Sequence, residues 1–150
     1  MQKITTWLWF DGQAEEAMAY YTSIFKNSKA GRITRHNGSV LTCSFELEGR
    51  EFTALNGGPQ FKFTEAVSLY VDCEDQAEVD YYWEQLTADG GAESQCGWLK
   101  DKFGLSWQII PRRLGELLSD ADGGRAQRAT EAMLKMRKID VAELERAAAG

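Results

Sequence analysis

The chain has few of the residues that usually carry covalent or metal chemistry. It contains one histidine and three cysteines. The histidine, His36, directly precedes Asn37-Gly38, a dipeptide typical of a tight hairpin turn, so we expect it at the surface and not in a catalytic triad. The cysteines, Cys43, Cys73 and Cys96, are odd in number and lack C-x-x-C spacing. This pattern argues against a disulfide framework and against a structural zinc site.

Basic charge and long apolar runs are also scarce. The formal net charge is −6 at pH 7 and the sequence pI is about 4.9, whereas proteins that bind nucleic acid carry basic patches. No stretch approaches the roughly 20 apolar residues that a membrane-spanning helix needs. With 150 residues, 43% of them hydrophobic, the chain can bury a core. We expect a soluble, cytoplasmic protein with no nucleic-acid or membrane partner.

The chain nearly repeats itself. Residues 4–10 form a β-rich run, and a helical pattern follows whose apolar residues share one face: Ala14, Ala17, Met18, Tyr21 and Phe25. Residues 67–71 later alternate like a strand, and Asp75 with Glu78 predicts a capped helix start. The second helix repeats the apolar face with Val79, Tyr82, Trp83 and Leu86.

Each helical pattern is followed by residues for three strands. These are 31–35, 40–47 and 51–55 in the first half, and 92–95, 98–101 and 105–110 in the second. The sequence therefore predicts an α+β fold in which two paired β-α-β-β-β modules form an open cup-shaped sheet. We expect one domain over 1–150, with modules at about 1–58 and 62–111 and a helical tail at 112–150. The apolar stripes of the tail predict a surface that docks on the body or on a second subunit.

The duplicated plan resembles the vicinal oxygen chelate superfamily, which includes glyoxalase I, bleomycin-resistance proteins and extradiol dioxygenases. Residues 52–61, 96–101, 103–111 and 132–140 resemble the PhnB-like branch, whose members often carry the label 3-demethylubiquinone-9 3-methyltransferase. The resemblance implies the cup, with helices outside, and a homodimer. It does not by itself imply a reaction, because function is decided by the site.

Metal-using relatives hold a divalent ion with His and Glu side chains of the cup strands. The resemblance carries these places to Thr5, to Leu55 or Asn56, to Ala66 with its neighbours, and to Gln108. Divalent ions prefer several carboxylates or imidazoles, and the only one at these four places is Glu65, a neighbour of Ala66. The standard ligand set is therefore not intact here. The remaining metal candidates are Glu65 and Gln108, and Glu65 is also the candidate catalytic carboxylate. The alternative is that Glu65 is a solvated residue beside the linker.

Aromatic and small polar residues are the candidates for contacting a small organic ligand in the cup. They are Trp7, Asn56, Phe63, Ser68, Tyr70, Cys96, Trp98 and Trp107. Aromatic walls with a few polar groups suit small planar molecules. For Trp107, and for Trp7 or Trp9, core and cup remain equally open, because strand alternation allows either. Cys43 and Cys96 could face the cup, where a thiol without a basic neighbour would be inert.

Three functions follow from this reading. The first is a protein of the PhnB-like branch that binds a small organic molecule in the aromatic cup. A metal-assisted lyase, isomerase or oxygenase with a weakened metal site is one form that it could take. The second is a non-catalytic protein that sequesters a ligand, as bleomycin-resistance proteins do. The third is the labelled methyltransferase, although no glycine pair, including Gly57-Gly58, stands in a G-x-G-x-x-G turn after a strand. The sequence leaves open whether any reaction is catalysed.

Overall fold

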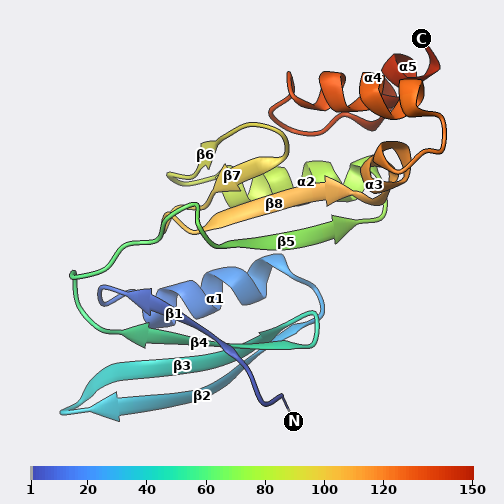
Figure 1. The fold of residues 1–150 in the computed structure, drawn as a ribbon. Helices are drawn as coiled ribbons and strands as arrows, with labels where there is room; N and C mark the ends of the chain where they lie inside the picture. The colour runs from blue at the N-terminus through green and yellow to red at the C-terminus, as the bar shows by residue number, and fades with distance from the viewer. Residues whose placement is uncertain (1) are drawn as a thin grey trace. The chain divides into compact units, whose positions relative to one another are not determined.

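The computed structural model describes residues 2–150 and divides into two units, one ending at Phe63 and one spanning Thr64–Gly150. Each unit contains a four-stranded mixed sheet, in the orders β1-β4-β3-β2 and β5-β8-β7-β6 (Figure 1). In both sheets the first strand of the module pairs with the last, in parallel. The α+β class and the repeated module are confirmed.

The first unit follows the predicted order of elements. It consists of β1 (Thr6–Phe10), α1 (Ala14–Ile24), β2 (Ser28–His36), β3 (Ser39–Leu47) and β4 (Arg50–Asn56). The predicted strands are all present, and β2 extends beyond the predicted 31–35 at both ends. Its exposed, polar residues carry no alternation that would have indicated those ends.

The core of the first unit lies between α1 and one face of its sheet. The residues of the predicted helical stripe are all buried, as are Leu8 and Phe10 of β1. The hairpin between β2 and β3 turns at Asn37 and Gly38, whose φ angles of 50° and 81° are those of the tight turn that the dipeptide predicts. His36 lies beside this turn and is exposed, as expected.

The second unit contains a smaller sheet and all the remaining helices. Its elements are β5 (Ser68–Cys73), α2 (Gln76–Thr87), β6 (Ala92–Glu93), β7 (Trp98–Lys100), β8 (Ser106–Pro111), α3 (Arg112–Leu118), α4 (Gly123–Met133) and α5 (Val141–Ala149). The predicted capping residue Asp75 accepts a hydrogen bond from the backbone N–H of Glu78, at 3.0 Å. The expected strand at 92–95 is shorter than predicted, because only its first two residues pair with β7.

The helical tail packs on β8 and α2 of the second unit and forms part of that unit's core. The apolar cluster that joins them contains Ile110, Leu114, Leu117, Ala129, Ile139, Leu144 and Ala148. Polar contacts join them as well, since the Gln76 side chain donates to the carbonyl of Ile139 at 3.0 Å and accepts from the N–H of Val141 at 2.7 Å. Within residues 2–150, no helix is both long and apolar enough to span a membrane.

Candidate functional site

One face of the first sheet is left uncovered by α1. The helix packs against β2, β3 and β4, and the buried residues Leu8, Phe45 and Ala54 lie on that covered side. Because side chains alternate along a strand, their neighbours lie on the opposite side. The strand register aligns Trp7 with Thr53 and then with Ser44 across this uncovered face.

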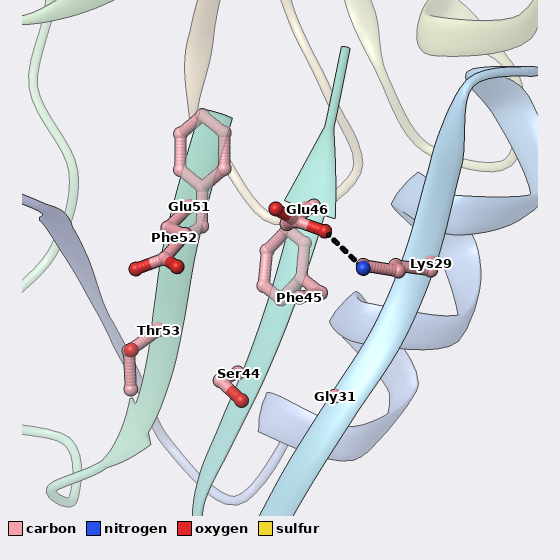
Figure 2. Close-up of a pocket in the computed structure, with 8 residues that line it drawn as sticks. All are labelled: Lys29, Gly31, Ser44, Phe45, Glu46, Glu51, Phe52 and Thr53. Atoms are coloured by element: carbon pink, nitrogen blue, oxygen red, sulfur yellow. Dashed lines mark ion pairs between the residues drawn. The ribbon is translucent and has the colours of Figure 1, made fainter. Parts of the chain in front are cut away.

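A depression of about 270 Å³ lies on the uncovered face of the first sheet (Figure 2). Its lining residues are Lys29, Gly31, Ser44, Phe45, Glu46, Glu51, Phe52 and Thr53. An ion pair crosses it from β2 to β3, with 3.0 Å between Lys29 Nζ and Glu46 Oε2. The sequence reasoning missed this pocket. The only signal in the sequence was a lysine and a glutamate on neighbouring strands. Whether these two side chains meet can be decided only when the register between the strands is known.

Two tryptophans of β1 have different roles. Trp7 is 58% exposed. Trp9 holds the segment after β4, since its indole N–H donates to the carbonyl of Gly58 at 2.9 Å and its ring meets Phe61 edge-on. A Cβ added at Gly57 would lie 2.3 Å from the Trp9 ring, so this close approach requires glycine. Of the two, Trp7 is therefore the one available to a ligand.

Asn56 and Phe63 are engaged within the first unit. The Asn56 side-chain oxygen accepts from the N–H of Ala14 at 2.9 Å, and its amide donates to the carbonyl of Val40 at 3.1 Å. Asn56, at the end of β4, therefore caps the start of α1 and links it to β3. Phe63 is partly buried and packs edge-on against Phe10, with ring centroids 5.5 Å apart.

The second sheet aligns six side chains in two rows on one face. Strand pairing places Ser68, Ser106 and Lys100 in the first row. The second row contains Tyr70, Gln108 and Trp98. The two rows are linked by a hydrogen bond of 3.0 Å from Gln108 Nε2 to Ser68 Oγ. Five of these six residues are exposed or partly exposed, and only Ser106 is buried.

Glu65, just before β5, contacts this face through Lys100. The Lys100 ammonium and the Glu65 carboxylate form an ion pair in which both side chains are substantially exposed. The hydrogen bond from Lys100 lowers the pKa of Glu65, and the positive charge adds to the effect. The predicted catalytic carboxylate is therefore held as a counter-ion of lysine.

The predicted metal residues do not fit a divalent cation as a donor set. Glu65 is neutralised by Lys100, and Gln108 supplies a neutral amide that donates to Ser68. In the described part of the chain, no three His, Cys, Asp or Glu side chains gather as a metal site would require. Divalent ions prefer several anionic or imidazole ligands. Metal binding at Glu65 and Gln108 stays a prediction.

Trp107 and two of the cysteines belong to the core. Trp107 is 2% exposed, and its indole N–H donates to Asp101 Oδ2 at 2.9 Å, which places it on the core side of the two alternatives. Cys43 lies on the α1 side of its sheet and not on the uncovered face, and burial raises its pKa. Burial also raises the pKa of Cys73 to about 12. Cys96 is partly buried at a positive φ of 58°.

Comparisons with known proteins agree with the fold. The family model described as 3-demethylubiquinone-9 3-methyltransferase matches residues 2–110. A PhnB protein from Bacillus cereus is 39% identical, and the match covers 73% of this chain and 99% of that one with a TM-score of 0.68. No curated protein matches the sequence. The family match ends before residues 132–140, so that segment of the expected resemblance lies outside it.

More distant structures share the fold alone. A glyoxylase/bleomycin resistance protein/dioxygenase domain from Frankia is 16% identical with a TM-score of 0.52, over 74% of this chain and 92% of that one. The fosfomycin resistance protein FosX from Listeria monocytogenes, solved with Mn(II) and sulfate, is also 16% identical with a TM-score of 0.52, over 71% and 88%. The chain belongs to the PhnB-like family labelled 3-demethylubiquinone-9 3-methyltransferase, and it shares its fold with glyoxalase/bleomycin resistance/dioxygenase domains.

Proposed function

We propose that the protein binds a small organic molecule on the sheet faces that no helix covers. The observation that carries this proposal is the depression of about 270 Å³ on the first sheet. Its volume is near the lower end of the range for ligand pockets, about 300–1,000 Å³, which favours a molecule smaller than a typical drug. Exposed Trp7 on the same face supplies the aromatic surface that a planar ligand would contact.

The proposal favours binding without a resident metal over metal-assisted chemistry. A lyase, isomerase or oxygenase of this superfamily type would need a donor set stronger than Glu65 and Gln108. A ligand-sequestering protein would not. The methyltransferase in the family label is the least supported, since the chain has no glycine-rich strand-to-helix turn for adenosyl-methionine. We further propose that the protein works as a cytoplasmic homodimer, and three free cysteines support a reducing compartment.

The five tryptophans allow the binding face to be tested directly. Their indole N–H signals can be followed in an NMR titration of the intact chain with a set of small aromatic compounds. We expect the signals of Trp7 and Trp98 to shift. The signals of Trp83 and Trp107 serve as internal controls, because their N–H groups are bound to Glu93 and Asp101. Compounds that shift only the two controls, or none of the five, would contradict the proposal.

The metal question has its own experiment. The protein is treated with a chelator, and its melting temperature is measured with Mn, Fe, Co, Ni and Zn, because an ion that binds only the folded state raises it. A flat response is expected from the donor set. A rise of several degrees that the Glu65→Ala/Gln108→Ala variant abolishes would instead establish a metal site at these residues. A rise that survives in this variant would place the metal elsewhere.

A further inference from the structure

Lys100 shares a face of the second sheet with the buried Ser106, and it forms an ion pair with the exposed carboxylate of Glu65. We propose that this face binds the carboxylate of a small planar organic acid on Lys100, and that the ligand displaces Glu65 from the lysine. The inference rests on the proposed function and specifies its ligand class. It assigns the recognition of charge to Lys100 and Ser106, which neither the family label nor the metal residues include.

The ion pair is built so that a competing acid can replace it. The exposed fractions of the Lys100 and Glu65 side chains are 45% and 62%, so water reaches both partners. An ion pair between exposed side chains contributes little to stability, and a free carboxylate can compete with it. Glu65 also precedes β5 and is not part of the sheet, so the carboxylate can leave without breaking strand pairing.

Ser106 supplies the second observation. It is 1% exposed, and its Oγ is a buried side-chain atom without a hydrogen-bond partner among residues 2–150. A buried hydroxyl that makes no hydrogen bond is unfavourable and calls for an explanation. Strand pairing places Ser106 directly between Ser68 and Lys100 on the same face. An oxyanion seated on Lys100 would accept the hydrogen bond that the Ser106 hydroxyl can donate.

The rest of the first row completes a set of donors. The Ser68 hydroxyl accepts from Gln108, which leaves its own proton to donate. Ser68, Ser106 and Lys100 therefore present two O–H donors and one ammonium in a line. Charge-assisted hydrogen bonds of this kind are about twice as strong as neutral ones. The row suits a carboxylate, whose oxygens accept several hydrogen bonds at once.

The second row indicates what the carboxylate is attached to. Tyr70 and Trp98 flank Gln108 on neighbouring strands, and Tyr70 is 58% exposed. Aromatic side chains contact planar rings favourably. The two rows together favour an aromatic or conjugated acid, with its carboxylate on the first row and its ring on the second.

Benzoate is the probe, with benzamide as a neutral molecule of the same shape. Binding to the intact chain is measured by NMR titration at millimolar concentrations. We expect benzoate to bind and benzamide to bind at least about tenfold more weakly, because the amide forms no charge-assisted bond with Lys100. Lys100→Met should lower benzoate affinity at least about tenfold. Lys138→Met is the matched control, since Lys138 forms a similarly exposed ion pair with Asp80 elsewhere in the second unit.

Two further variants separate ligand binding from a structural role. Glu65→Gln should raise benzoate affinity about two- to fivefold, because it removes the competing carboxylate. Ser106→Ala should weaken benzoate binding without lowering the melting temperature, since it deletes a hydroxyl that has no hydrogen bond to lose. If Glu65 itself bound the ligand or a metal, Glu65→Gln would lower the affinity for benzoate instead.

The outcomes distinguish this inference from the proposed function. If benzoate fails to bind, binds no better than benzamide, or is unaffected by Lys100→Met, the carboxylate site is wrong. Lower benzoate affinity in Glu65→Gln would overturn it as well. In each case the proposed function survives if other compounds still shift the Trp7 or Trp98 indole signals. It fails only if no compound shifts either signal.

Discussion

Asp101 is the buried carboxylate that holds the turn between β7 and β8, and its removal should be severely destabilising. It is 2% exposed. Its Oδ1 accepts from the backbone N–H groups of Phe103 at 2.9 Å and Leu105 at 3.1 Å, and its Oδ2 accepts from the Trp107 indole at 2.9 Å. The two strands that it joins carry the predicted carboxylate site, so the turn also positions the ligand face.

The expected loss can be estimated from the groups left without partners. Asp101→Ala orphans the N–H of Leu105 and the indole N–H of Trp107, both in buried hydrogen bonds. Each buried donor without a partner costs about 1–3 kcal/mol. The N–H of Phe103 is only partly buried and can turn to water. We therefore expect a loss of about 3–5 kcal/mol in the free energy of unfolding, a large fraction of the about 5–15 kcal/mol typical of a domain.

Urea unfolding followed by circular dichroism measures this loss. Asp101→Asn should be less harmful, because it keeps one acceptor oxygen, but its NH₂ group cannot accept from the Trp107 indole. Asp72→Ala is the control: this aspartate pairs with Arg112, and both side chains are more than half exposed. Its removal should change the free energy of unfolding far less. Equal losses for Asp101→Ala and Asp72→Ala would refute the role assigned to the buried carboxylate.

Two other predictions concern parts of the fold that support the candidate faces. Asn56→Leu should destabilise the first unit by about 2–4 kcal/mol, because Ala14 N–H and Val40 C=O both lose their partner. Hydrogen exchange of the first-unit amides measures this loss, and unchanged exchange would argue against the capping role. Truncation after Pro111 should cause aggregation or unfolding of the second unit, because it removes Leu114 and the other tail residues that bury Ile110. Gel filtration tests this, and a soluble truncated chain of unchanged size would show that the tail is peripheral.

Periodicity predicts the elements whose one face is buried. The helical stripe of α1 and the alternation of Leu8 and Phe10 identify their elements because burial repeats with the period of the backbone. The signal fails where burial does not alternate. Strand β2 is largely exposed, so its ends were missed. Strand β8 is buried on nearly every residue, so alternation could not decide whether Trp107 faced the core.

The candidate site was predictable in residue type but not in partners. Glu65 and Gln108 were predicted as metal ligands, with Glu65 also as the catalytic carboxylate, yet their contacts with Lys100 and Ser68 depend on strand register. A register shift of one residue moves every side chain to the other face. The register between two strands depends on the geometry of the turn that joins them, which the sequence pattern alone does not give. Asp101 was missed for a related reason. Its partners are backbone N–H groups and one indole, and backbone donors leave no mark in the sequence.

The helical tail lies outside the family match, and it contacts the segment that leads into the candidate ligand face. The match ends at residue 110, before the three tail helices begin at Arg112, and 73% of this chain covers 99% of the Bacillus cereus relative. The tail nevertheless binds the backbone just before Trp98: the N–H groups of Cys96 and Gly97 donate to Met136 and Arg137, both at 2.8 Å.

Gly97 shows how close this contact is. It has a φ of 86°, and a Cβ there would lie 2.6 Å from Ile110 Cδ1 and 3.1 Å from Ile139 Cγ1. Only glycine combines this backbone conformation with so little space. The same residue therefore packs against the tail and leads into the strand that carries Trp98 and Lys100.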